Sequence, residues 1–102
     1  MLKHIVVWKF ADNAEGKTKA ENLEIVKESL YALCGIIPQI KKMEIGIDES
    51  RTEMSGDIIL LTEFDSKEDL KIYAEHPEHV KVGQYVKKVC LSRTVVDYTV
   101  ED

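Results

Sequence analysis

The sequence predicts an α+β fold in which helices cover one face of an antiparallel sheet. Segments with apolar residues at every second position alternate along the chain with segments in which apolar residues recur every three or four positions. Glycine, proline and short polar stretches separate these segments. A chain of 102 residues is long enough for one domain and too short for two, so we expect a single domain over residues 1–102.

The first part of the chain predicts a strand, a turn and a helix. Residues 3–10 form an alternating strand, whose two faces both carry apolar side chains. Residues 12–16 form a polar turn, and from about Thr18 the apolar spacing becomes helical. Thr18 and Glu21 have the spacing of a capping box. Gly35, in a left-handed cap, and Pro38 are expected to end this helix.

The remainder of the chain predicts three strands and two helices. Residues 41–47 alternate, and the nearly continuous apolar run in residues 57–64 is typical of a strand buried on both faces. A helix begins at Ser66 and reaches about Glu75, and Pro77 suits the first position of a further helix that ends near Val89. Residues 93–100 close the chain as an alternating strand.

The order strand, helix, strand, strand, broken helix, strand is that of a ferredoxin-like fold. Its four-stranded antiparallel sheet carries helices on one face only. On the other face, Ile5, Val7 and alternate residues of 58–61 would leave an exposed apolar patch, which usually marks an interface. Two such sheets packed face to face would bury it. The sequence therefore predicts a homodimer that forms a dimeric α/β barrel.

Composition excludes several classes of partner. The net charge is −5 and the lysines are interleaved with acidic residues, which argues against nucleic acid binding. The apolar runs are too short to span a membrane, and no signal peptide precedes the first strand, so a cytoplasmic protein is expected. Cys34 and Cys90 are interpreted as buried small hydrophobic residues without a disulfide.

The segment from Tyr73 to Val80 concentrates groups able to do chemistry, since it holds two of the three histidines. Histidine has an unperturbed pKa near neutrality and so transfers protons readily. His79 is either a general base in a cleft or a structural residue at a helix start. His76 is interpreted as the cap of that helix. The proline breaks the helical spacing that HExxH zinc sites need, so neither a metal nor a cofactor is expected.

Two residues outside this segment bear on the site. His4 shares a strand face with Val6 and Trp8, where it either is a satisfied core residue or reaches His79 across the cleft. Asp97 lies on the last strand and is expected to pair with Lys9 or Arg93.

Over nearly its full length the chain resembles the stress-responsive dimeric α/β barrel (Dabb) family. The matching residues are Lys3-His4-Ile5-Val6, Ile37-Pro38, Ile45-Gly46, Phe64, Tyr73-x-x-His76-Pro77-x-His79-Val80 and Val96-Asp97-Tyr98. The resemblance implies a compact homodimer. By analogy with a plant polyketide cyclase of the family, it also implies that His79 is the general base, that Tyr73 assists and that His4 lines the pocket.

Two functional hypotheses follow. In the first, the cleft between helices and sheet binds a small apolar or carbonyl-bearing molecule, with cofactor-free lyase, cyclase or isomerase chemistry as its enzymatic version. The expected lining is Val6, Trp8, Val26, Leu30 and Val80. In the second, the protein is a non-catalytic dimer module for stress response or protein contact, with structural histidines. Whether the cleft or the space between two sheets forms the binding chamber is open from the sequence.

Overall fold

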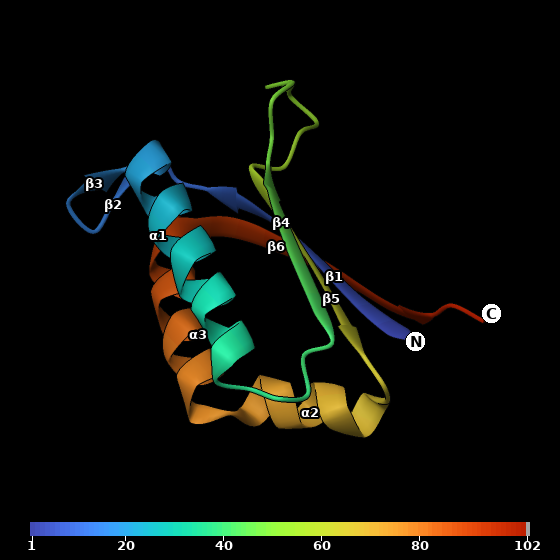
Figure 1. Ribbon diagram of the computed structural model, residues 1–102. Coiled ribbons are helices and arrows are strands. Elements are labelled where there is room, and N and C mark those ends of the chain that lie inside the picture. The colour runs from blue at the N-terminus through green and yellow to red at the C-terminus, as the bar shows by residue number, and fades with distance from the viewer. Residues whose placement is uncertain (102) are drawn as a thin grey trace.

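A four-stranded antiparallel sheet forms the frame of the molecule, and helices cover one of its faces (Figure 1). This computed structural model describes residues 1–101. The strands are β1 (Leu2–Phe10), β4 (Lys42–Ile47), β5 (Ile58–Phe64) and β6 (Cys90–Thr99), in the order β4-β5-β1-β6. The helices are α1 (Lys19–Ala32), α2 (Lys67–Glu75) and α3 (Pro77–Val89). This is the ferredoxin-like α+β arrangement that the order of elements predicted.

The register of the sheet decides which side chains meet on its helix-covered face. β1 lies between β5 and β6 and pairs antiparallel with both. His4 lies opposite Asp97, and Trp8 lies opposite Arg93. Because directly paired residues point to the same side of a sheet, all four face the helices.

The core lies between this face and the helices. Its most buried side chains come from every layer: Val6, Phe10, Val26, Leu30, Ile37, Ile58, Leu60, Phe64 and Tyr73. One fully buried polar residue, Asn22, is satisfied within this core. Its amide donates to the carbonyl of Ala14 at 3.1 Å, and its side-chain oxygen accepts from the Tyr85 hydroxyl at 2.5 Å. These bonds tie α1 to α3, because Asn22 and Tyr85 lie on those two helices.

The sequence predicted the start of α1 correctly, but the structure ends the helix in a different way. Thr18 caps the helix, and a reciprocal capping box with Glu21 is present, as expected. The left-handed Gly35 cap was wrong, because a 3₁₀ turn, Leu33–Gly35, ends the helix instead. The amides of Ile36 and Ile37 both donate to the carbonyl of Leu33, which supplies the hydrogen bonding that a glycine cap would otherwise provide.

Two other segments also depart from expectation. The polar turn at residues 12–16 lies within a small hairpin, β2 (Asn13–Ala14) with β3 (Lys17–Thr18). Glu15 and Gly16 at its tip both have positive φ, as a type I′ turn requires. The last strand begins at Cys90, three residues before the predicted start at Arg93, because β1 extends its pairing to this point through an irregularity at Phe10.

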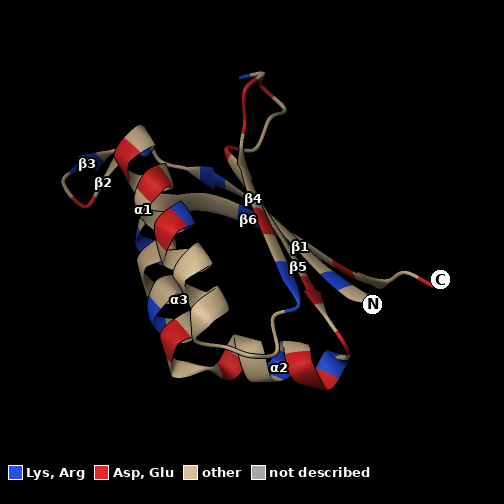
Figure 2. Cartoon of the chain, viewed as in Figure 1, with Lys and Arg blue, Asp and Glu red and all other residues tan. Residues whose placement is uncertain are grey.

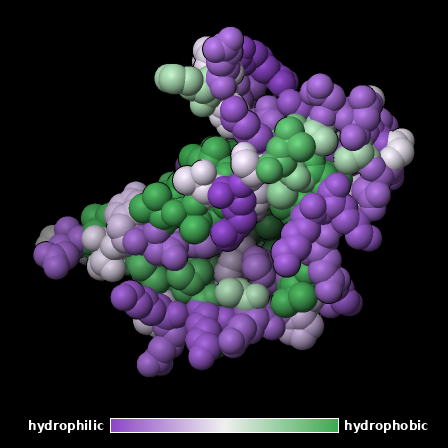
Figure 3. All heavy atoms as spheres, turned by 180° about the vertical axis from the view of Figure 1, so that it is seen from behind, coloured by the Kyte–Doolittle hydropathy of each residue, from purple (hydrophilic) through white to green (hydrophobic). Residues whose placement is uncertain are grey.

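The face of the sheet opposite the helices is apolar, as the two-sided pattern of the first strand predicted. Ile59, Val96 and Tyr98 are 42%, 55% and 43% exposed. Ile5 lies between Leu61 and Val96 in register, and it is half-buried. In the reverse view of the molecule, hydrophobic atoms occupy the middle and hydrophilic atoms the margins (Figure 3). An apolar surface of this kind is unusual for a chain that has no partner.

Charged side chains lie mainly at the periphery. Residues of both signs follow one another along α1 and α2 (Figure 2). Among residues 1–101, no helix combines the length and apolar character that crossing a membrane requires.

Candidate functional site

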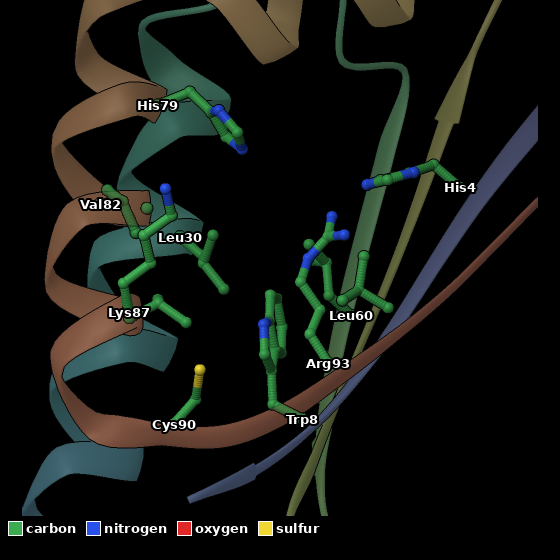
Figure 4. Close-up of a pocket in the computed structure, with 12 residues that line it drawn as sticks. His4, Trp8, Leu30, Leu60, His79, Val82, Lys87, Cys90 and Arg93 are labelled. Carbon is green, nitrogen blue, oxygen red and sulfur yellow. The ribbon is translucent and has the colours of Figure 1, made fainter.

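A cavity of about 240 Å³ opens between α3 and the helix-covered face of the sheet. Its floor comes from β1, β5 and β6, one wall from α3, and a further side chain from α1 (Figure 4). The lining residues are His4, Val6, Trp8, Leu30, Leu60, His79, Val82, Gly83, Val86, Lys87, Cys90 and Arg93. Most of these side chains are apolar, so the few polar groups determine what chemistry the cavity supports.

His79 is placed over the cavity by the break between α2 and α3. His76 adopts an extended conformation there, its Nδ1 accepts a hydrogen bond from the Glu78 amide at 3.1 Å, and Pro77 starts α3. This confirms the capping role predicted for His76. One turn into α3, the ring of His79 is turned toward the cavity (Figure 4).

The hydrogen bonding of His79 fixes its tautomer. Nδ1 lies 3.0 Å from the carbonyl oxygen of Ala74, which can only accept, so Nδ1 carries a proton. Burial lowers the pKa of His79, and the nearby His4, Arg93 and His76 lower it further, against the opposing effect of the Ala74 bond. A neutral ring with Nδ1 protonated has a free lone pair on Nε2, which is the requirement for a general base.

His4 faces His79 from the opposite wall and is held by Asp97. Its Nδ1 lies 2.5 Å from Oδ1 of Asp97, and the residue is 8% exposed. Since the carboxylate accepts, Nε2 is the nitrogen left for the cavity, and it is directed there (Figure 4). The expectation that Asp97 pairs with Lys9 or Arg93 was wrong, because the register of β1 and β6 places Asp97 directly opposite His4.

Tyr73 lies behind His79 rather than in the cavity. It is 1% exposed, and its ring centroid lies 4.3 Å from that of His79 and 5.1 Å from that of Phe64. Burial raises the pKa of Tyr73 strongly, with a smaller contribution from Cys34, so the hydroxyl stays protonated. Within residues 1–101 that hydroxyl has no hydrogen-bond partner, and so it forms none with His79. The rings of Tyr73 and His79 are therefore in contact through packing and not through a hydrogen bond.

The lining differs from the expected set at two positions. Val6, Trp8 and Leu30 line the cavity as expected. Val26 and Val80 do not: Val26 is 1% exposed within the core, and Val80 is 42% exposed on α3. Position 80 follows His79 by one residue, which on a helix turns its side chain about 100° away.

The α3 residues of the lining were missed, although a signal for them exists in the sequence. Beyond His79 they are Val82, Gly83, Val86 and Lys87. Counted from His79, these follow the three-and-four spacing of one helix face. Arg93 was missed for a related reason, since its placement follows from strand alternation once the register with Trp8 is known.

The cysteines correct another expectation, because Cys34 is exposed and Cys90 lines the cavity. Both are free. Among residues 1–101, the structure brings together no group of three or more histidine, cysteine or acidic side chains that would suit a metal ion. The polar groups of the lining residues include two imidazoles, each with Nδ1 engaged, and two cationic side chains, together with the Cys90 thiol and the Trp8 indole N–H, which has no hydrogen-bond partner among residues 1–101.

Comparison with protein families matches residues 2–100 to the stress responsive A/B barrel domain (Dabb). Olivetolic acid cyclase from Cannabis sativa is 32% identical over 101 residues, which is 96% of this chain and 95% of the cyclase.

Solved structures give the same fold. A dimeric ferredoxin-like protein of unknown function from Bacteroides fragilis is 36% identical, with a TM-score of 0.82 over 97% of this chain and 95% of its own. Hydroxynitrile lyase from Passiflora edulis has a TM-score of 0.80 over 99% and 94% of the two chains. At 15% identity, that likeness shows a shared fold alone.

Proposed function

The chain belongs to the stress responsive A/B barrel family, and from this premise we propose that it binds a small carbonyl-bearing apolar molecule in the cavity and transfers a proton at the carbon beside the carbonyl. The observation that carries the proposal is the free Nε2 of His79 in a mainly apolar cavity, opposite the His4–Asp97 pair. The reaction class is a cofactor-free cyclase, lyase or isomerase.

The proposed step begins when His79 Nε2 removes a proton from the carbon next to the carbonyl. The C–H electron pair forms a carbon–carbon double bond, and the carbonyl π electrons move to oxygen, giving an enolate. His4, when its Nε2 carries a proton, donates a hydrogen bond to that oxygen, and Asp97 faces the resulting positive charge. His79 then returns the proton to carbon. In the ring-closing version the enolate carbon instead attacks a second carbonyl of the same molecule, a carbon–carbon bond forms, the π electrons of that carbonyl move to its oxygen, and the protonated His79 gives its proton to the resulting alkoxide.

Tyr73 has a supporting part in this scheme. Its ring packs against His79, and its hydroxyl lies outside the cavity lining. We assign it as a positioning residue that holds the imidazole over the cavity. This replaces the direct role that the resemblance implied.

The cyclase relative supports the ring-closing version of the reaction. It is a cyclase by name and is 32% identical to this chain. The aliphatic residues Leu30 and Leu60 of the cavity set the shape that a cyclising molecule would have to fit here.

Proton exchange at a simple ketone tests the proposal without knowledge of the natural substrate. With acetophenone in D₂O, NMR would follow the loss of the methyl protons. We expect the protein to accelerate this loss, and His79→Ala to lower the acceleration at least tenfold, since positioned bases contribute about 10²–10⁴-fold. Val80→Ala is the matched control, because Val80 neighbours His79 but lies outside the lining.

A cavity-filling variant separates the cavity from other surfaces. A Cβ added at Gly83 would meet no atom within 4 Å, and Gly83 lines the cavity, so Gly83→Leu projects into open space. We expect it to suppress exchange while the protein remains folded. Exchange that is unchanged in both His79→Ala and Gly83→Leu would contradict the proposal and favour a non-catalytic dimer module.

We also propose that the apolar face of the sheet pairs with a second copy of the chain. Ile59, Val96 and Tyr98 expose apolar surface there, and the Bacteroides fragilis relative is dimeric. Two sheets packed on these faces would form the dimeric α/β barrel.

A further inference from the structure

The charged side chains that line the cavity are cationic. Two cationic residues, Arg93 and Lys87, line it, and no aspartate or glutamate does. Among residues 1–101, neither of them has a carboxylate within ion-pair distance. Asp97, the acidic residue on the same face of β6, is engaged by His4. Within the described chain, the cavity therefore presents positive charge with no protein counter-charge.

Arg93 is the cation that points into the site. It lies opposite Trp8 in the register of β6 with β1, so its side chain leaves the sheet on the helix-covered side. Its guanidinium lies in the space between His79 and His4 (Figure 4). Lys87 rises from α3 and belongs to the opposite wall.

A guanidinium in this position selects for a particular chemical group. Its planar set of N–H donors matches the two oxygens of a carboxylate, and such charge-assisted pairs are stronger and more directional than neutral hydrogen bonds. Arg93 is exposed, so solvent screens part of this attraction, and the match between the planar donors and the carboxylate supplies the selectivity. A ligand with a neutral head would form no charge-assisted pair with Arg93.

We propose that the ligand is an apolar carboxylic acid that also carries a carbonyl, and that Arg93 binds its carboxylate and determines this specificity. This rests on the function proposed above, since it identifies the substrate class of the same cavity. The carboxylate fixes one end of the molecule, and its apolar body lies along Val6, Leu30 and Leu60. The carbonyl is thereby held within reach of the two histidines.

Three probes of equal length test the assignment: hexanoate, hexanamide and hexylamine, measured by isothermal titration calorimetry. We expect the protein to bind hexanoate roughly tenfold to a hundredfold more tightly than hexanamide, the range that charge-assisted hydrogen bonds produce, and hexylamine most weakly. Arg93→Gln should bring hexanoate and hexanamide to within about twofold of each other, while Lys87→Gln retains most of the preference.

A titration of His79 provides a readout that loss of folding does not mimic. The charge of Arg93 contributes to the lowered pKa of His79. Saturating hexanoate should therefore raise the pKa of His79 in the unaltered protein, as followed by NMR. In Arg93→Gln, which no longer holds the carboxylate, the same concentration of hexanoate should raise that pKa much less.

The outcomes separate the two proposals. Equal binding of hexanoate and hexanamide to the unaltered protein, or a preference that survives in Arg93→Gln, overturns the carboxylate assignment and leaves the cavity as a binding site. A preference lost in Lys87→Gln but kept in Arg93→Gln overturns the choice of residue. If none of the three probes binds, the carboxylate assignment fails, and the proposed function is judged separately by the exchange of acetophenone protons.

Discussion

At the scale of single residues, the site depends on which nitrogen of each histidine is occupied. Nδ1–H of His79 donates a hydrogen bond to the Ala74 carbonyl, and Nδ1–H of His4 donates one to Asp97. In both residues Nε2 is left for a ligand. The two differ in surroundings, because His79 packs against Tyr73 whereas His4 faces a carboxylate. This difference suits His79 to accept a proton and His4 to support charge on oxygen.

The pH dependence of proton transfer follows from the environment of His79. Its folded pKa lies below the ordinary 6.5, so the neutral base persists to lower pH than a free imidazole would. We expect kcat/KM for ketone exchange to rise with pH and to have its midpoint below pH 6.5. A profile measured by NMR between pH 4 and 8 checks this, and a midpoint above 6.5 would contradict the proposed base.

The same shift has a consequence for stability. Because the folded pKa is lower, the unfolded chain binds more protons, so stability rises with pH. The contribution of His79 is complete above about pH 6.5 and is lost as the pH falls through its folded pKa.

At the scale of elements, the break between α2 and α3 carries the site. His76 closes α2 through its amide and opens α3 through its ring, and Pro77 sets the first turn of the new helix. This change of direction places the third residue of α3, His79, over the sheet. The face of α3 that follows then supplies one wall of the cavity.

Substitution of His76 tests its role at the start of α3. We expect His76→Ala to lower the free energy of unfolding by about 0.5–1 kcal/mol, because the Glu78 amide loses its acceptor. His76→Asn is the matched control, since asparagine is a favoured cap and restores an acceptor. Urea denaturation followed by circular dichroism measures both, and equal loss in the two variants would contradict the capping explanation.

At the scale of the whole molecule, the two faces of the sheet differ in what they present. The helix-covered face holds the cavity, and the other presents apolar residues from β1, β5 and β6. β6 contributes to both, since Arg93 and Asp97 face the helices while Val96 and Tyr98 face outward. β6 contributes side chains both to the cavity and to the outer face. Packing of a second copy on the outer face would therefore also fix the position of β6.

The proposed dimer predicts a specific effect of charge on that outer face. Ile5→Glu places a carboxylate between Leu61 and Val96, where pairing of two sheets would bury it without a partner. We expect a monomer by light scattering where the unaltered protein is a dimer. Ile72→Glu is the control, because Ile72 is 46% exposed on α2, away from this face, and should leave the dimer intact. A stable monomer from the unaltered protein would exclude the two-sheet arrangement.

The fold followed from the sequence because its signals are local. Alternation identified three strands of the sheet, a nearly continuous apolar run identified β5, and the Thr18 and Ser66 caps marked helix starts. Predictions were wrong where the same local sequence was compatible with more than one backbone conformation. Gly35 could have ended α1 in a left-handed cap, but a 3₁₀ turn ended it instead, with the Leu33 carbonyl accepting from the amides of Ile36 and Ile37.

Only part of the site could be predicted, because some of its residues are placed by local patterns and others by strand register. His4 and His79 could be named from their residue type and motif, as could Trp8 and Leu30 from their spacing. The positions of Asp97 and Arg93 depend on pairings between residues far apart in the chain, whereas the α3 wall follows the helical spacing counted from His79. No local pattern states which residue of β6 lies opposite His4.

The sequence by itself determined the order of elements, the apolar character of both sheet faces and which histidines were candidates for a site, because periodicity and residue type are properties of short segments. Only the tertiary structure decided that Asp97 holds His4, that Tyr73 lies behind His79 and that Arg93 enters the cavity. These depend on strand register and on the angle between α3 and the sheet, both of which are set by packing across the whole core.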